Sequence, residues 1–194
     1  DAVFDDQISE EKHKFYESEA LRYYANIVAT FTPFVIKGLE KLQDLPVDMI
    51  CPSHGIIWRE NPATIIDMYR RYASYADGPA EKEVTLIWGS MYGNTRQVVT
   101  TVIETLRKRN IPVHVYRVPG DDMGYILADA WRSAGLIFGM PTYEYKMFPP
   151  VAHVISELQT KKVRQKKVFR FGSFGWSGGA QRDFEVKTEK AGWD

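Results

Sequence analysis

One loop in the second half of the sequence carries the residue types that bind a phosphate group. It joins an apolar, strand-like segment to a helix-like one. Its residues are Ser90, Met91, Tyr92, Gly93, Asn94 and Thr95. A helix N-terminus offers unpaired backbone N–H groups and a favourable dipole, and Ser and Thr add hydroxyls. Gly93 allows close backbone approach or a positive φ angle. The same residues also suit an ordinary helix N-cap, in which Asn94 or Thr95 binds the first turn.

Two later loops combine flat aromatic side chains with small or polar residues. The first contains Pro141, Thr142, Tyr143 and Glu144, and the second contains Ser173, Phe174, Gly175, Trp176, Ser177 and Gly178. Tyr143 and Trp176 suit stacking on an isoalloxazine ring, while nearby backbone groups bond its polar rim. The three loops together therefore predict a site for FMN. The alternative is that the two aromatic side chains only pack within their own loops.

The elements that would position these loops alternate between strand and helix. Apolar, β-rich segments are expected as buried parallel strands at 84–88, 113–118, 135–139 and 167–171. Helical stretches are expected at 95–109, 122–132, 150–159 and 179–191. This alternation predicts an α/β fold with a doubly wound parallel sheet, in which ligands bind beyond the carboxyl ends of the strands. A flavodoxin-like sheet in the order 2-1-3-4-5 would still need its last strand.

The first 76 residues have a different character. Apolar residues recur with helical spacing from Ser18 to Asp44, and Pro33 should kink or divide that run. A short strand is expected at 48–51, then a loop with His54, then a helix from Pro62 to about Tyr75. The polar, Gly- and Pro-containing stretch at 77–83 is predicted to be a linker. Such a helical part is too small to bury a core of its own easily, so both ends of the sequence look truncated.

Composition excludes several classes of function. The 25 Lys and Arg residues balance the 25 Asp and Glu residues, which gives no electrostatic reason to expect nucleic acid or an anionic membrane as a partner. The longest apolar run, at 135–140, is too short to span a bilayer. The single cysteine, Cys51, excludes an internal disulfide and a four-thiolate iron site, and it favours the cytoplasm.

The ordered motifs resemble those of the flavodiiron proteins, also called A-type flavoproteins. The loop Ser90–Thr95 is similar to the flavodoxin phosphate signature, and 171–179 is similar to the third FMN loop of that family. The segments 22–27 and 47–55, with Ile57, Trp58 and Arg59, resemble the end of its metallo-β-lactamase-like αββα domain. The resemblance implies that 1–76 is the C-terminal portion of that domain, 77–83 a linker and 84–194 the flavodoxin-like FMN-binding domain. It also implies an oxidoreductase in which FMN relays electrons to a diiron centre that reduces dioxygen to water or nitric oxide to nitrous oxide.

The same resemblance implies that His54 is an iron ligand. From the residues alone, a single loop histidine is more often structural or solvated. The family's remaining ligands precede the region represented here, so the diiron centre would need a missing N-terminal half, supplied by a separate chain or removed by cleavage. Asp1, Asp5 and Asp6 are expected to be surface acids. Metal binding is not expected at the other histidines, which are His13, His114 and His153.

Partners follow from the resemblance as well. It implies an electron donor such as rubredoxin or a reduced cofactor, and a head-to-tail homo-oligomer that brings FMN close to iron. Two other functions remain compatible with the residues. A flavodoxin-type electron carrier with an unrelated helical extension would need only the three loops, and a non-catalytic scaffold would need none of them, since a fold alone does not determine function.

Overall fold

The apolar segments of the second half form a four-stranded parallel sheet. The computed structural model describes residues 3–78 and 80–194. The strands are β1 (Glu81–Trp88), β2 (Val113–Arg117), β3 (Ser133–Gly139) and β6 (Lys167–Phe171). Their order is β2-β1-β3-β6, and every neighbouring pair is parallel. This confirms the α/β fold and reproduces the first four positions of the flavodoxin-like order.

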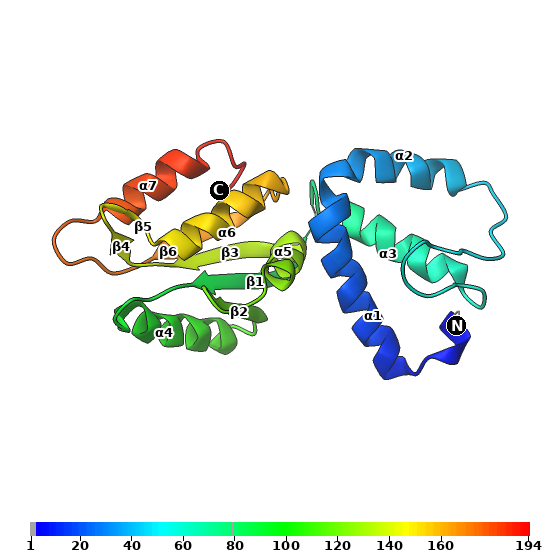
Figure 1. The fold of residues 1–194 in the computed structure, drawn as a ribbon, viewed down its shortest axis with the longest axis horizontal. Coiled ribbons are helices and arrows are strands. Elements are labelled where there is room, and N and C mark those ends of the chain that lie inside the picture. The colour runs from blue at the N-terminus through cyan, green and yellow to red at the C-terminus, as the bar shows by residue number, and fades with distance from the viewer. Residues whose placement is uncertain (1–2, 79) are drawn as a thin grey trace.

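Helices cover both faces of the sheet (Figure 1). The helix α4 (Asn94–Lys108) packs on one face, where Leu86, Trp88 and Ile137 are buried against Val99. The opposite face carries α5 (Met123–Arg132), α6 (Pro149–Thr160) and α7 (Gly179–Thr188). Successive strand residues point to opposite faces, so a strand buried on both sides must be apolar throughout. That is why the two central strands, β1 and β3, were visible in the sequence.

The strand register brings the carboxyl ends of the strands together. Trp88 at the end of β1 pairs with Arg117 on one side and with Gly139 on the other. Gly139 in turn pairs with Phe171 at the end of β6. The loops that follow β1, β3 and β6 therefore begin at one edge of the sheet.

The first part of the chain is helical. It contains the 3-10 helix η1 (Asp5–Gln7), α1 (Glu10–Tyr23), the π-helix η2 (Tyr24–Val28), the 3-10 helix η3 (Ala29–Phe31), α2 (Thr32–Leu42) and α3 (Pro62–Ser74). Pro33 lies in the first turn of α2, so the long apolar run is divided there as predicted. The helix α1 begins well before Ser18, because the Ser9 side chain accepts a hydrogen bond from the Lys12 amide and caps a charged, solvated first half.

Three local predictions were wrong. The expected strand at 48–51 is a single isolated bridge between Ile50 and Trp58. The strand β1 starts at Glu81, so the last residues of the predicted linker belong to the sheet. A short antiparallel hairpin, β4 (Thr142–Tyr143) with β5 (Lys146–Met147), lies where only a loop was expected. Strands of two residues are too short to show an alternating pattern.

The helical part and the sheet share one apolar core. Tyr24 of η2 is fully buried and lies in the same cluster as Trp131 of α5. The Trp131 indole nitrogen donates a hydrogen bond to the Tyr72 carbonyl oxygen at 2.9 Å. Asn26 donates to the Gly124 carbonyl oxygen at 3.1 Å. The helices thus stabilise one another through α5, although they are too few to form a closed core alone.

None of the helices in the described ranges, 3–78 and 80–194, is long and apolar enough to cross a membrane.

Candidate functional site

The predicted phosphate loop forms the start of α4. Gly93 is the N-cap residue and has a φ of 87°, a left-handed conformation that glycine adopts at little cost. Its amide donates to the Ser90 hydroxyl oxygen at 3.0 Å, which closes the turn. A Cβ atom at Gly93 would meet nothing within 4 Å, so the space beside the turn is open. The backbone amides of 94–96 lie in the first turn of α4. They have no acceptor within the helix, because no turn precedes them.

Thr95 joins this loop to the loop after β6. Its side chain is buried, and its hydroxyl oxygen lies 3.4 Å from that of Ser173. The two hydroxyls come from the ends of β1 and β6, which are separated by β3 in the sheet. The N-cap alternative alone does not require such a contact between distant loops. Two hydroxyls beside a helix N-terminus form a suitable cradle for a phosphate group.

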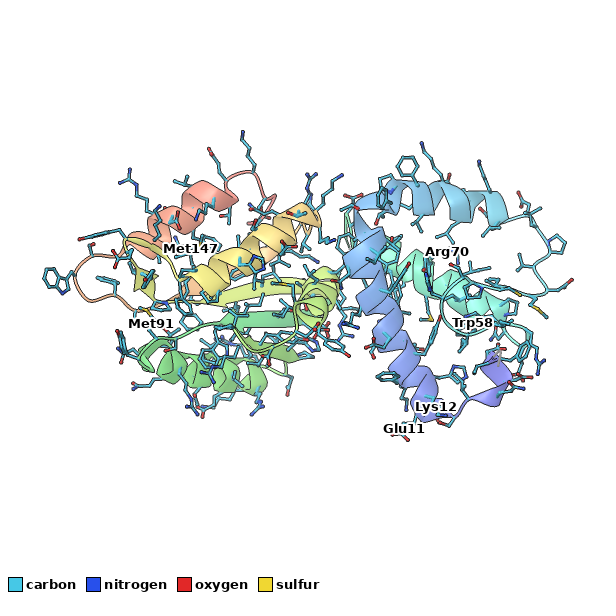
Figure 2. All side chains as sticks on the ribbon, in the orientation of Figure 1. Glu11, Lys12, Trp58, Arg70, Met91 and Met147 are labelled. Atoms are coloured by element: carbon cyan, nitrogen blue, oxygen red, sulfur yellow. The ribbon has the colours of Figure 1, made fainter. Side chains whose placement is uncertain are left out.

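The loop after β3 is bonded both to the loop after β6 and to the start of α7. Thr142 donates its amide to the Ser173 carbonyl oxygen at 2.8 Å, and its hydroxyl oxygen accepts from the Ala180 amide at 3.2 Å. Tyr143, the last residue of β4, is 46% exposed. Pro141 is buried and Glu144 is exposed. Met91 and Met147, labelled in Figure 2, lie at this same end of the sheet.

The loop after β6 presents aromatic side chains to solvent. Trp176 is 98% exposed and Phe174 is 64% exposed. Ser177, Gly175 and Gly178 are exposed around them. The alternative that Trp176 only packs within its loop is inconsistent with this exposure, since a packed indole buries most of its surface. Figure 1 shows the loop between β6 and α7 extending beyond the sheet edge.

The arrangement offers two kinds of surface side by side. Hydroxyls and helix N–H groups gather at the start of α4, and exposed aromatic rings lie on the hairpin and on the loop before α7. An FMN molecule needs both, one for its phosphate and one for its ring. The residues present therefore fit this cofactor.

Close backbone approaches hold the loops, and the sequence analysis did not single them out. A Cβ atom at Gly172 would lie 1.7 Å from the Met140 carbonyl oxygen, and one at Gly179 would lie 2.0 Å from the Tyr145 carbonyl oxygen. Both glycines are thus required where the backbones of neighbouring loops touch. The available signal was the position of each glycine, directly after a strand or at the start of a helix.

His54 lies in an exposed turn between α2 and α3. Its ring centroid lies 5.9 Å from that of Tyr23. It borders a largely apolar cavity of about 590 Å³ between α1, α2 and α3 that also contacts Leu39, Ile65 and Tyr69. Within 3–78 and 80–194 there is no group of three or more His, Cys, Asp or Glu side chains arranged for a metal ion. His54 is free to bind a metal only with ligands from elsewhere.

The remaining acidic and histidine residues have structural surroundings. His153 is exposed on α6. His114 of β2 lies between the carboxylates of Glu83 and Asp129, at 3.1 and 3.2 Å. Burial raises the pKa of Glu83, but the hydrogen bond from His114 and the charge of Arg132 outweigh it and lower that pKa. This cluster begins at the amino end of β1, away from the three loops.

The prediction that Asp5 is a surface acid was wrong. Its side chain is buried, and it accepts hydrogen bonds from the backbone amides of 59–61 at 2.9–3.2 Å. Burial raises the pKa of Asp5, yet these bonds outweigh it and lower the pKa to about 2. The His13 ring nitrogen Nε2 donates a hydrogen bond to the Asp5 backbone carbonyl oxygen at 2.9 Å. Asp6 is exposed and paired with Arg59, and Asp1 lies outside the described residues.

Known proteins match this chain over nearly its whole length. No protein-family model matches it. It is 33% identical to an anaerobic nitric oxide reductase flavorubredoxin of Vibrio vulnificus, over 99% of this chain and 38% of that protein. The rubredoxin oxygen:oxidoreductase of Desulfovibrio gigas superposes with a TM-score of 0.89 at 26% identity, over 100% of this chain and 48% of that one. A flavo di-iron protein variant from Thermotoga maritima gives a TM-score of 0.87 at 26% identity, with the same coverage.

The matched region covers residues both before and after residue 80. The chain spans less than half the length of these relatives. Its sheet order and loop placement agree with the flavodoxin-like part of the resemblance. The chain is therefore homologous to a part of the flavodiiron proteins.

Proposed function

We propose that this chain is the FMN-binding part of a flavodiiron oxidoreductase that reduces nitric oxide, dioxygen or both. The observation that carries this proposal is the convergence of three loops at one sheet edge, marked by the contact between Thr95 and Ser173. The relatives support it through their names, one as a nitric oxide reductase flavorubredoxin and one as a rubredoxin oxygen:oxidoreductase. The proposed division of the chain is a portion of a metallo-β-lactamase-like domain at 1–76, a linker at 77–83 whose last residues, 81–83, already join β1, and the FMN-binding domain at 84–194.

Each loop has its own task in this proposal. The loop Ser90–Thr95 holds the phosphate through its hydroxyls and through the first-turn amides of α4. Pro141–Glu144 and Ser173–Gly178 flank the isoalloxazine ring, with Tyr143 and Trp176 as stacking side chains. FMN accepts and donates electrons one or two at a time, and that chemistry is its contribution. The protein residues bind it, orient it and exclude water from one side of the ring.

The iron centre is proposed to use one ligand from this chain. Imidazole is a suitable iron ligand, and His54 lies in an exposed turn beside an open apolar cavity. The described residues provide no complete metal site, so the other ligands must come from the remainder of the polypeptide or from a second chain. The exposed apolar side chain of Ile27, which borders this cavity, supports such a contact, as do the exposed rings of Phe31 and Phe34 later in the same helical run.

The partners are proposed from the same relatives. The electron donor is a rubredoxin or a reduced cofactor, and the complete protein is a cytoplasmic, head-to-tail homo-oligomer in which the FMN of one protomer lies close to the iron of the next. Electron transfer requires a short separation between FMN and iron. His54 and Thr95 belong to different parts of the chain, so the head-to-tail arrangement would bring the two cofactors together.

Cofactor analysis of the complete assembly tests the function. Purification of the chain with the remainder of its polypeptide should give iron together with FMN, and turnover of dioxygen or nitric oxide with reduced donor. FMN without iron and without turnover would instead support a flavodoxin-type electron carrier. A colourless protein that does not take up FMN would leave only a scaffold role and would overturn the proposal.

A further inference from the structure

Asp183 of α7 contacts the β4–β5 hairpin, which contributes Tyr143 to the proposed flavin site. Its carboxylate accepts a hydrogen bond from the Met147 amide at 3.0 Å. The same oxygen lies 3.1 Å from the Lys187 ammonium group, one helical turn further along α7. The Asp183 side chain is 16% exposed and Met147 is buried. The carboxylate therefore satisfies an amide that water cannot reach freely.

The hairpin has a backbone that needs outside support. Its two turn residues, Glu144 and Tyr145, have φ angles of 46° and 59°. Two-residue hairpin turns of the type I′ class require positive φ at both central positions and normally use Asn or Gly there. A pair of larger residues adopts this conformation only where the surrounding structure imposes it. With two residues in each strand, the ladder itself is too short to do so.

The helix α7 supplies that support at three points. The Ala180 amide donates to the Thr142 hydroxyl at the first strand, Gly179 lets the Tyr145 carbonyl oxygen approach the helix, and Asp183 binds the Met147 amide at the second strand. The first two contacts are local to the start of the helix. Asp183 is the charged contact, and a hydrogen bond to an ionised acceptor is stronger than one between neutral groups.

We propose that Asp183 is a positioning residue that holds the β4–β5 hairpin, and with it Tyr143, in the geometry that receives the flavin ring. The inference rests on the proposed FMN function and deepens it. Asp183 touches no part of the ring in this account. It acts through the Met147 amide, so its effect falls on ring binding and on the hairpin, and the phosphate loop after β1 is unaffected.

The test compares substitutions on one helix. Asp183→Ala removes the acceptor, Asp183→Asn keeps an acceptor oxygen without charge, and Glu185→Ala removes a neighbouring carboxylate that pairs with Arg170. In the flavin-free protein, the Met147 amide should exchange with solvent faster in Asp183→Ala and remain protected in Glu185→Ala. Affinities for FMN and riboflavin should fall by the same factor, about tenfold, in Asp183→Ala. At saturating FMN, the visible absorption envelope of the bound flavin should shift in that variant.

Asp183→Asn separates this role from general stabilisation. The retained oxygen should keep FMN affinity within about threefold of the unmodified protein. Equal losses in Asp183→Asn and Asp183→Ala would overturn the proposal, as would unchanged Met147 exchange in Asp183→Ala. If Asp183→Ala does not fold, the FMN affinity and the Met147 amide exchange of Asp183→Asn test the proposal in its place. Absence of FMN binding in the unmodified protein would refute the proposed function, whereas hairpin exchange would still report on the contact itself.

Discussion

The hydroxyl oxygens of Thr95 and Ser173 lie 3.4 Å apart, although the two residues are 78 positions apart in the sequence. Thr95 lies in the first turn of the helix after β1, and Ser173 lies near the start of the loop after β6. Their contact joins the two segments across the end of β3, the strand that lies between β1 and β6 and ends with Gly139. Loops that touch in this way form one surface, which is the physical basis for assigning them a single ligand.

Removal of these hydroxyls should weaken phosphate binding selectively. Thr95→Val keeps the shape of the side chain and loses the hydroxyl, and Ser173→Ala does the same at the partner. A hydrogen bond to a charged group contributes about 1.5–3 kcal/mol, so FMN affinity should fall roughly tenfold or more in Thr95→Val. Riboflavin lacks the phosphate, and its affinity should change little. Fluorescence titrations with both flavins measure the difference.

Thr100→Val is a matched control on the same helix, because Thr100 is exposed and bonds only to the preceding turn. It should leave both affinities unchanged. Equal losses for FMN and riboflavin in Thr95→Val would show that Thr95 supports the fold and does not contact the phosphate.

Gly172→Ala should disrupt the loop that carries Trp176. The new methyl group would lie 1.7 Å from the Met140 carbonyl oxygen, and neither backbone can move without breaking the hydrogen bond between the Met140 amide and the Phe171 carbonyl oxygen. We expect loss of FMN binding and a lower thermal midpoint. Gly175→Ala is the control for the thermal midpoint, since its methyl group would meet nothing within 4 Å. Similar behaviour of the two variants would contradict the close approach at Gly172.

Asp5 should contribute to stability in a pH-dependent manner. Its pKa is lowered from 3.8 to about 2, because hydrogen bonds from backbone amides outweigh the effect of burial. A depressed pKa gives a contribution that is complete above the unfolded value and is lost as the pH falls toward the folded value. Asp5→Ala should reduce the free energy of unfolding by about 1–3 kcal/mol at pH 7, and by progressively less from pH 4 down to pH 2.

Urea denaturation at several pH values measures this contribution. Asp6→Ala serves as the control, because Asp6 forms an exposed ion pair with Arg59 and should cost less than about 1 kcal/mol. A cost for Asp5→Ala that is no larger than for Asp6→Ala, or that does not change with pH, would contradict the buried arrangement.

Lys166 should give a pH dependence of the same sign as Asp5, but in the alkaline range. Burial lowers its pKa to about 8, while its ammonium group donates to the carbonyl oxygens of Trp131 and Ser133 at 2.7 Å. Between about pH 8 and 10.5 the unfolded chain binds the proton more tightly, so this residue makes stability rise with pH. The free energy of unfolding of the unmodified protein, relative to that of Lys166→Met, should therefore increase by up to about 1.4 kcal/mol per pH unit.

The neighbouring Lys167 provides the comparison. It is 80% exposed, and Lys167→Met should show no such pH trend relative to the unmodified protein. A flat difference for Lys166→Met over this range would mean that Lys166 titrates at an ordinary pKa.

The central strands β1 and β3 were predictable because their C-terminal halves are buried on both faces and therefore largely apolar, as at Leu86 and Phe138. The β4–β5 hairpin was not, since its turn uses Glu144 and Tyr145 where the usual signal is Asn or Gly. Asp5 was misplaced for a related reason. Its role depends on amides more than fifty residues away, and no local pattern reveals such a partner.

The loop residues of the candidate site could be named from their types and positions, yet their mutual contacts could not. Ser90 and Gly93 follow a local turn rule. The contacts that join Thr95 to Ser173 and Asp183 to Met147 arise only when the strand register is set, because they link segments that are distant in sequence.

A titration of the flavin-free protein with FMN and with riboflavin tests the central claim most directly. The account predicts saturable binding of FMN at one site, with quenched flavin fluorescence, and weaker binding of riboflavin by about tenfold or more because the phosphate contacts are missing. Absence of saturable FMN binding, or equal affinities for the two flavins, would contradict it.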